Sequence, residues 1–584
     1  MGAIFGIVGD GSLGEVQAMG AAVRHRGQHQ QYWSPARGVY FGQGEHRPFE
    51  IDGPAMATDW HVAGDQSDLP DRFARTGPAA LASLRGTFSL ALCVGPASVC
   101  LAVDHMGFKS LYYAVLRDRF VFASEYKSLL ALADVPLEPN RSAIQHYLAT
   151  KSPLDRQAFL ACVRSVRPGE ALEYAAGHLL HASSYWKPNP AVIERTPEEH
   201  ARVVGEALLS AVERQVSPYE QIGITLGAGI DAAIVLGAVR RVAPDVRVSS
   251  FTIGAGETDW EIVGARETAS LFGTDHHEYI FDPLAIRTDL PRLVWLTEDC
   301  GGREEVILQM HVLAHAAAHT KAIFGGYSAD RVFGGMPRHR LVDLADRLPV
   351  FGTPLRELFQ LTQCGATPSS LAGRALQRAL YGSTPPQALP VPGAETTPSV
   401  YWAPELNRYI CGTVQGCPSY QHLEPFHEVG AATFHSPFLD PDLIAVSLTV
   451  PSWLKTGWRR QKRVLREATA GIVPSRIRNR RKAMQRLDVR GMMGQVLCDL
   501  ADEWLVDSAI QEHGLLTRAQ LNRLGLERTQ VRERREVALR LWSVLSLECW
   551  ARQFLTAQRA KPATAAPELM RIAHVPARSK LSLS

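Results

Sequence analysis

The sequence predicts an α/β protein of more than one domain, with a layered β domain first and a doubly wound parallel sheet with helical additions after it. Its 584 residues are enough for several domains and a large core. Up to about Trp186, short apolar segments alternate with Gly, Asp and Pro, a pattern typical of β-strands joined by turns. Beyond that point, strands alternate with helices through short connections, which favours a parallel sheet with helices on both faces.

The composition excludes several classes of function. Hydrophobic residues make up 46% and charged residues 21% of the chain, as in a soluble globular protein. A net charge of +3 gives no reason to expect a nucleic acid or a membrane surface as partner. No apolar run approaches the ~18–20 residues that span a bilayer, and the first residues lack a signal-peptide pattern. Nine scattered cysteines without a CxxC pair predict a reducing cytoplasm, with neither a disulfide framework nor a zinc site.

We assign the first domain to residues 1–190. Residues 2–10 form a predicted strand that runs to the first turn, and residues 142–148 form a predicted helix. The segment Pro188-Asn189-Pro190 is typical of a linker. Between these, further predicted strands cover Val39–Phe41, Thr87–Val94, Val99–Val103, Leu111–Val115 and Phe120–Ala123.

The second domain covers residues 191–560, and residues 561–584 are predicted to be a flexible tail. Ligands of parallel sheets bind where the strands end, so Leu226, Ile253 and Phe324 are expected to meet at the site. Later parts of the domain look mostly helical and contain a proline-rich insert at 385–398. The predicted strands are Ile222–Leu226, Val246–Ile253, His277–Phe281 and Lys321–Phe324, and the predicted helices are Pro197–Val216, Glu261–Phe272, Val306–His319 and Val537–Phe554.

The segment from Ile222 to Arg240 is the strongest candidate for a binding site. A short apolar strand is followed by the turn Gly227-Ala228-Gly229 and then by Asp231 at the start of a helix. Small residues let backbone N–H groups approach an anion, and a helix N-terminus favours negative charge, so this arrangement suits phosphate. Asp231 can bind Mg²⁺, which in turn binds phosphate oxygens. A strand, turn and helix with no ligand is the alternative, because no Gly-Lys-Ser/Thr of the Walker pattern follows.

Taken in order, short motifs along nearly the whole chain resemble those of the asparagine synthetase superfamily. The opening MGAIFGIVG is similar to the family's MCGIFGIVG, and TLGAGIDAA stands where the family has LSGGxDSS. The resemblance implies an N-terminal, class II glutamine amidotransferase-like domain of the Ntn type and a C-terminal ATP-pyrophosphatase domain. Other segments that resemble family motifs are RHRG at 24–27, DHMGFKSLYY at 104–113, FASEYKSLL at 122–130, SFTI at 250–253, GTDHHE at 273–278, GYSADRVFGG at 326–335, PFLD at 437–440 and RRK at 480–482.

Three departures from the family fall in the first domain. The family's nucleophile for glutamine hydrolysis is a cysteine at position 2, where this chain has Gly2. The family's glutamine-binding NGE appears as Thr58-Asp59-Trp60, and Arg85 stands where a glutamine-binding aspartate is expected. No other nucleophile and base are apparent there, so we expect this domain to be an inactive structural remnant.

The second domain keeps the positions that the family uses for ATP and Mg²⁺. The resemblance implies that Asp231 and Asp330 both bind Mg²⁺ on ATP, and the alternative is that they only cap their helices. Lys482 matches the lysine that stabilises charge when the acyl-adenylate is attacked; a solvated basic run is the other interpretation, with Lys462 or Arg480 as the next candidate. The residues implied in nucleotide binding are Leu226, Gly227, Ala228, Gly229, Asp231, Ile253, Gly325 and Gly326.

The Gly227–Gly229 turn and the start of the following helix lack side chains that the family has there. Gly227, Ala232 and Ala233 replace serines, and each lost hydroxyl removes a hydrogen bond to an anion worth ~1.5–3 kcal/mol. Ala228 replaces a glycine, and a left-handed backbone there would cost a further ~1–2 kcal/mol. ATP use is therefore expected to be weakened, and a non-catalytic binding scaffold is an alternative. Tyr327 replaces a family glutamate, which predicts a changed acceptor substrate.

The missing cysteine narrows the reaction that the resemblance implies. Family members without it join a carboxylate to an amine already present in the substrate, as β-lactam synthetases and lasso-peptide macrolactam synthetases do. The chain length, Tyr327 and the insert favour the lasso-peptide type, with a precursor peptide as substrate and ATP and Mg²⁺ as cofactors. A leader-peptide protease and a leader-binding protein are candidate partners. The alternative is a β-lactam synthetase or another small-molecule amide synthetase.

Overall fold

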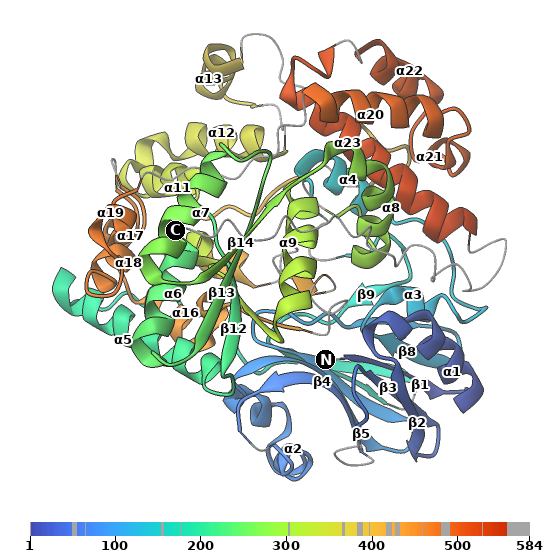
Figure 1. Cartoon of the computed structure of the whole chain (residues 1–584). Coiled ribbons are helices and arrows are strands. Elements are labelled where there is room, and N and C mark those ends of the chain that lie inside the picture. The colour runs from blue at the N-terminus through green and yellow to red at the C-terminus, as the bar shows by residue number, and fades with distance from the viewer. Residues whose placement is uncertain are drawn as a thin grey trace.

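The computed structural model describes residues 2–49, 55–64, 66–152, 157–175, 177–301, 304–364, 368–381, 389–395, 398–415, 423–424, 426, 432–457, 460–480, 491–527 and 530–557. Lys482, the predicted tail and most of the proline-rich insert lie outside the described residues. In Figure 1 a β-rich domain lies at the bottom, a second sheet lies above it, and helices extend to the top. No helix in the described part of the chain is long and apolar enough to cross a membrane.

The first domain consists of two stacked antiparallel sheets. One has the strand order β2 (His29–Ala36), β3 (Val39–Glu45), β1 (Gly2–Gly9), β8 (Arg119–Ala123), β7 (Tyr112–Val115) and β9 (Arg164–Ser165). The other has the order β11 (His178–Ser184), β10 (Glu170–Ala175), β6 (Ser98–Val103), β5 (Gly86–Gly95) and β4 (Met56–Val62). Strand β1 is buried on both faces because its side chains alternate: Ile4 and Val8 pack between the sheets, whereas Phe5 and Ile7 pack on the other side with α1 (Leu13–Ala22).

The second domain is built on one parallel sheet, as the sequence predicts. Its order is β14 (Asp275–Ile280), β13 (Arg247–Gly254), β12 (Gln221–Thr225), β15 (Ala322–Phe324) and β16 (Thr433–His435). Every strand pair in it is parallel. Thr225 pairs with Phe251, which pairs with His277 on the edge strand. The predicted strands agree with the observed ones to within two residues at each end, and Leu226 lies one residue past β12.

Helices cover both faces of this sheet. Arg266 of α7 (Trp260–Phe272) contacts Glu278 of β14, whereas the neighbouring His277 contacts α9 (Glu305–His319). Because adjacent strand residues point to opposite faces, α7 and α9 lie on opposite sides of the sheet. Helix α5 (Pro197–Val216) has the predicted bounds, and a capping box of Thr196 and Glu199 begins it. Helix α6 (Ile230–Val242) follows β12.

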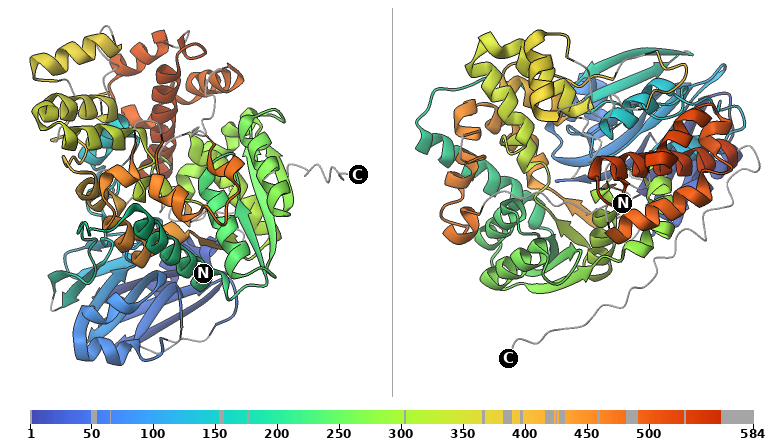
Figure 2. Two further views of the ribbon diagram at one scale, coloured as in Figure 1. Left: turned by 90° about the vertical axis from the view of Figure 1, so that its left-hand side faces the viewer. Right: turned by 90° about the horizontal axis from the view of Figure 1, so that it is seen from above.

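The C-terminal helices form the upper part of the molecule and return to the first domain (Figure 2). The long buried helix predicted there is α23 (Arg535–Ala551), continued by a π-helical turn at Arg552–Thr556. Its Trp550 Nε1 donates a hydrogen bond to the hydroxyl of Tyr126 at 2.8 Å, which links the last helix to the first domain. The remaining α-helices are α2 (Leu69–Thr76), α3 (Tyr126–Leu129), α4 (Arg141–Thr150), α8 (Ile286–Thr297), α10 (Ala329–Val332), α11 (Pro337–Arg347), α12 (Gly352–Cys364), α13 (Leu371–Tyr381), α14 (Leu406–Val414), α16 (Pro441–Leu448), α17 (Ser452–Lys455), α18 (Arg463–Ala468), α19 (Ser475–Arg478), α20 (Gly491–Trp504), α21 (Ala509–Glu512) and α22 (Arg518–Glu527).

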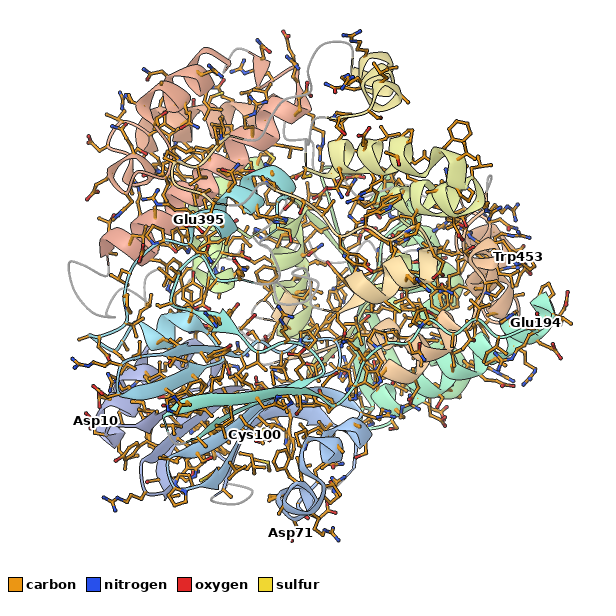
Figure 3. All side chains as sticks on the ribbon, turned by 180° about the vertical axis from the view of Figure 1, so that it is seen from behind. Asp10, Asp71, Cys100, Glu194, Glu395 and Trp453 are labelled. Carbon is orange, nitrogen blue, oxygen red and sulfur yellow. The ribbon has the colours of Figure 1, made fainter. Side chains whose placement is uncertain are left out.

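The cysteines of the described residues carry free thiols. Cys100, labelled in Figure 3, is fully buried in β6. Burial raises the pKa of its thiol, so it stays protonated and unreactive. Cys100 therefore contributes to packing between strands and not to chemistry.

Candidate active site

Two carboxylates and one ammonium group meet where the central parallel strands end. Asp231 lies in the first turn of α6, after β12, and Asp330 lies in α10, after β15. Lys462 places Nζ 2.5 Å from Oδ1 of each carboxylate. The two Oδ1 atoms are therefore no further apart than twice that distance, which one divalent ion can span after small side-chain rotations. Because Mg²⁺ prefers oxygen ligands, Asp231 and Asp330 fit the magnesium site that the resemblance implies.

Neither carboxylate caps its helix. The N-cap residue of α6 is Gly229 and that of α10 is Ser328, so each aspartate lies two positions further along. A capping side chain acts from the N-cap position itself. The alternative interpretation of Asp231 and Asp330 as helix caps is therefore wrong, and both side chains turn to Lys462 instead.

Lys462 reaches the carboxylates from an unusual backbone conformation. Its φ of 57° and ψ of 40° are left-handed, and Ser328 beside Asp330 is also left-handed, with a φ of 70°. Non-glycine residues rarely adopt this conformation, and such residues cluster at functional sites. Burial alone would lower the pKa of Lys462, but Asp231 and Asp330 outweigh it and raise that pKa. The lysine therefore stays charged and can neutralise phosphate placed beside the carboxylates.

The Gly227–Gly229 turn is occupied by a side chain of the protein. The backbone N–H of Ala228 donates a hydrogen bond to Oε2 of Glu261, at 2.6 Å. A Cβ at position 227 would lie 2.4 Å from the same oxygen, so the glycine there leaves room for Glu261. Burial raises the pKa of Glu261 to about 7. The carboxyl group thus lies where the resemblance places a phosphate oxygen.

The predicted nucleotide residues converge around the start of α6. Leu226 and Ile253 are buried, and the Leu226 N–H donates to the carbonyl oxygen of Phe251 at 2.8 Å. A Cβ on Gly326 would lie 2.4 Å from the carbonyl carbon of Asp231, so the turn after β15 touches the start of α6. Gly325 directly precedes that turn.

One predicted strain is absent. Ala228 is not among the described non-glycine residues with a positive φ, so the cost that a left-handed alanine would bring does not arise. Arg480 contacts the Gly227–Gly229 turn through its guanidinium, which donates to the carbonyl oxygen of Ala228 at 3.2 Å. The same guanidinium pairs with Glu267 at 2.6 Å. The predicted role of Lys482 is not tested, since that residue lies outside the described part. Lys462 is the lysine that the structure brings to the carboxylates.

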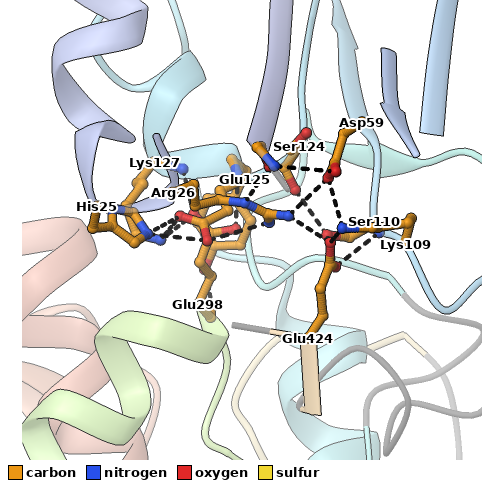
Figure 4. A network of polar contacts seen from close by, with 12 residues as sticks. His25, Arg26, Asp59, Lys109, Ser110, Ser124, Glu125, Lys127, Glu298 and Glu424 are labelled. Atoms are coloured by element: carbon orange, nitrogen blue, oxygen red, sulfur yellow. Dashed lines mark hydrogen bonds and ion pairs between the residues drawn. The ribbon is translucent and has the colours of Figure 1, made fainter. Parts of the chain in front are cut away.

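A buried ion network fills the first domain where the resemblance places glutamine (Figure 4). Asp59 accepts a hydrogen bond from the Gly2 N–H at 3.2 Å and pairs with Arg26 at 3.2 Å and Lys109 at 2.9 Å. Glu424, from the second domain, pairs with the same two cations, at 2.5 and 3.1 Å. These four charged side chains are at most 1% exposed. Burial alone would raise the pKa of Asp59, but Lys109 and Arg26 hold it at about 2.

The network continues to a second contact between the domains. Glu125 pairs with Arg26 at 3.4 Å and with His25 at 2.9 Å, and it also contacts Lys127. Lys127 in turn pairs with Glu298 of the second domain at 3.3 Å. Figure 4 shows Glu298 and Glu424 entering the network from the second domain. The two domains are therefore joined by buried ion pairs.

Position 2 has no room for a side chain. Gly2 pairs with Glu45 across β1 and β3, and a Cβ on Gly2 would lie 1.8 Å from the carbonyl oxygen of Gly44. It would also lie 2.9 Å from the Glu45 carboxyl group. A cysteine here would require the backbone of β3 to move.

Arg85, the third departure from the family, contacts the second domain, as the buried ion network does. Its guanidinium pairs with Asp442 of α16 at 3.1 Å. Arg85 lines a cavity of about 270 Å³ between the domains, together with His61 and His435. Burial lowers the pKa of His435 to about 3, so His435 adds no charge to the cavity at neutral pH.

The comparisons with known proteins agree with this architecture. The asparagine synthase family matches residues 203–398 and 430–552, and the glutamine amidotransferase domain matches residues 54–186. Fold and site together define the asparagine synthetase type of ATP-dependent amide formation. Since the first match covers more than half of the chain, the protein belongs to the asparagine synthase family.

Three relatives illustrate the range of similarity. The glutamine-hydrolysing asparagine synthetase 1 of Bacillus subtilis is 24% identical over 561 residues, which cover 89% of this chain and 85% of that protein. A putative glutamine-hydrolysing asparagine synthetase of Mycobacterium tuberculosis is 24% identical over 474 residues, covering 74% and 70%. The carboxyethyl-arginine β-lactam synthase of Streptomyces clavuligerus is 28% identical over 277 residues, covering 47% and 50%.

Proposed function

We propose that this chain closes a macrolactam ring in a lasso-peptide precursor, with ATP and Mg²⁺ as cofactors and the cytoplasm as its location. An Asp or Glu carboxylate of the peptide attacks the α-phosphorus of ATP, which forms an acyl-adenylate and releases pyrophosphate. The N-terminal amine of the peptide then attacks the acyl carbon, loses a proton and expels AMP. The observation that carries this proposal is the pair of carboxylates, Asp231 and Asp330, joined by Lys462.

The residues of the second domain have separate tasks in the proposed reaction. Asp231 and Asp330 would hold Mg²⁺, which stabilises charge on the departing pyrophosphate. Lys462 stays charged and would contact phosphate oxygens when the metal takes the carboxylates. The N–H groups of the Gly227–Gly229 turn would bind phosphate after Glu261 releases Ala228.

The proposed nucleophile is an amine of the substrate and not ammonia from glutamine. Gly2 carries no thiol and has no room for one. Asp59, Lys109 and Glu424 fill the place where the family binds glutamine. Removing one partner from such a buried pair costs about 3–5 kcal/mol, so glutamine would displace the network only at high cost. We therefore propose that the chain has no glutaminase activity.

The acceptor side of the site supports a peptide as substrate. Tyr327, which replaces a family glutamate, packs edge-on against Phe434 with ring centroids 5.8 Å apart. An aromatic surface suits the side chains of a peptide better than it suits a small charged amino acid. A precursor peptide also requires a leader-peptide protease, and a leader-binding protein is the second proposed partner.

The β-lactam synthase relative supports a second candidate function. That protein is named for closing a β-lactam on carboxyethyl-arginine, which is also an intramolecular amide formation. The same carboxylates and the same lack of a nucleophile at Gly2 serve either reaction. A non-catalytic scaffold is the third candidate, because Glu261 occupies the turn that would bind phosphate.

One experiment separates the three candidates. ATP–pyrophosphate exchange is measured with a candidate precursor peptide and with small amino-carboxylates, and products are identified by mass. Peptide-dependent exchange with a product lighter by one water supports macrolactam formation, whereas exchange with a small carboxylate supports the second candidate. ATP binding without any exchange supports a scaffold.

Matched variants test the metal role in the same assay. Asp231→Asn and Asp330→Asn should each abolish Mg²⁺-dependent exchange, because removing one anionic ligand costs several kcal/mol, or ~10³-fold or more. Asp245→Asn, at an exposed position before β13, is the control and should leave exchange unchanged. Normal turnover of either site variant at limiting Mg²⁺ would exclude that residue as a ligand.

A further inference from the structure

Three histidines lie together on the face of the parallel sheet that α9 covers. His315 and His319 are four residues apart on α9, so their side chains share one face of that helix. His277 lies on β14, the edge strand, which runs beside α9 in Figure 1. One ligand atom from each of the three histidines lies within 4.8 Å of the other two. This spacing is that of side chains that can contact one ion.

Two of the three imidazole groups are in the state that metal binding requires. Burial, together with His319 and His277, lowers the pKa of His315 to about 3. Burial and His277 also lower the pKa of His319. These two rings are therefore neutral at pH 7 and can offer a lone pair to a metal ion.

His277 also has an orienting partner. Oδ2 of Asp275 lies 3.1 Å from Nε2 of His277, and the two residues share one face of β14. A carboxylate on one ring nitrogen fixes an imidazole and makes the other nitrogen a better ligand. By contrast, the adjacent His276 points to the other face, where its ring contacts Ser250.

Ring packing is the simpler interpretation of this cluster. Phe251 lies 5.0 Å from His277 and 5.7 Å from His315 between ring centroids, and Tyr279 lies 3.6 Å from His315. Packing alone gives the ring nitrogens no partner, however. Among the described residues, neither His315 nor His319 makes a hydrogen bond through its ring. The ring nitrogens of His315 and His319 are not among the buried polar atoms without a partner, so they can contact either water or a shared ion.

We propose that His277, His315 and His319 bind one transition-metal ion, with Zn²⁺ as the preferred ion and water as the fourth ligand. Three neutral imidazoles select borderline ions such as Zn²⁺, whereas the carboxylates Asp231 and Asp330 select Mg²⁺. The ion joins the edge strand β14 to α9, which also packs against β12, β13 and β15. The ion therefore links the edge strand β14 to the helix that packs on the central strands. This structural role is separate from the amide-forming reaction.

Zinc titration of the full-length protein tests this site. The chain, freed of any histidine tag and of metal by chelation, is titrated calorimetrically with ZnCl₂ without ATP. We expect one ion per chain, and with CoCl₂ the visible absorption of four-coordinate Co²⁺. His319→Gln should weaken Zn²⁺ binding by ~10²-fold or more, because it removes a ligand. This exposed position should tolerate the change, which circular dichroism checks.

A matched control keeps the test specific. His178→Gln changes an exposed histidine on β11 and should leave the zinc affinity unchanged. Asp231→Asn should also bind Zn²⁺ as the wild type does, which separates this site from the magnesium carboxylates. Absence of saturable Zn²⁺ binding, or equal affinity in His319→Gln and the wild type, would show that the three rings only pack.

Discussion

Replacing Lys462 by methionine removes one charge from the centre of the proposed active site and little volume. In the wild type, Nζ lies 2.5 Å from both Asp231 and Asp330, and the lysine side chain is 5% exposed. Without the ammonium group, the two carboxylates lose the cation that pairs with both of them. We therefore expect Lys462→Met to destabilise the fold without Mg²⁺ and Mg²⁺ to restore the loss.

The size of the effect follows from burial. Breaking a fully buried ion pair costs about 3–5 kcal/mol. Asp231 and Asp330 are 23% and 29% exposed, so water screens part of their repulsion, and about 2 kcal/mol is the expected loss at pH 7. Mg²⁺ at a free concentration of about 100 times its Kd adds about 2.7 kcal/mol to the folded state, which is enough to cancel that loss.

Urea unfolding with and without Mg²⁺ measures both quantities. In the wild type, Mg²⁺ has to displace Lys462 from the carboxylates, so its stabilising effect should be smaller than in Lys462→Met. Lys321→Met, at an exposed position before β15, is the control and should respond to Mg²⁺ as the wild type does. Equal stability of Lys462→Met and wild type without Mg²⁺ would refute the reasoning, as would equal Mg²⁺ effects.

Three further predictions concern the two domains. Glutamine should neither support nor inhibit the reaction, and Gly2→Cys should release no glutamate from glutamine, because Gly44 blocks position 2. Lys482→Ala should reduce the proposed macrolactam formation by ~10²-fold or more, measured by product mass, with a smaller change in ATP affinity, and Lys482→Arg should not rescue it fully. Burial raises the pKa of Glu261 from 4.5 to about 7, so the folded protein loses stability as the pH rises through that interval and Glu261 ionises. Glu261→Gln should therefore add up to ~3 kcal/mol to the unfolding free energy at pH 8 and nothing at pH 4.

The strands and helices of the second domain could be predicted because their apolar pattern is local. Strand β12, the turn after it and α6 follow from an apolar run, small residues and a helical period. Strand β16 could not be predicted, since three residues carry no period. In the first domain, β2, β4, β10 and β11 were not predicted from their sequences either.

The residues that contact one another within the site are far apart in the sequence, so local patterns did not predict their contacts. Lys462 and Asp231 are 231 positions apart, and Lys462 has a left-handed backbone where they meet. Arg26 and Glu424 are 398 positions apart, and no local pattern links a histidine-arginine motif to that glutamate. Glu261 was visible only as the start of a helix, and its contact with Ala228 follows from the packing of α7 on the turn. Sequence motifs thus identified the two carboxylates, Asp231 and Asp330, but not the lysine ammonium group that joins them.

The spacing of the histidines in the sequence indicated a cluster, but the prediction of no zinc site considered only the cysteines. The segment HVLAHAAAH places His311, His315 and His319 four residues apart on one helix face. His311 pairs with Asp289 at 2.7 Å, which leaves the last two for another role. The prediction of no zinc site rested on cysteines alone, and only the structure shows that His277 faces the same helix.

The site carries ions of its own where the nucleotide and metal would bind. Lys462 lies between the carboxylates in the place proposed for Mg²⁺, and the Glu261 carboxyl group accepts the Ala228 N–H in the place proposed for phosphate. Phosphate entering the turn would repel an ionised Glu261 and would raise its pKa further. Because that pKa is already about 7, the carboxyl group can take up a proton at little cost and release Ala228. Burial of Glu261 thus lowers the cost of vacating the turn for phosphate, but it does not replace the hydrogen bonds of the serine hydroxyls that the family has at 227, 232 and 233.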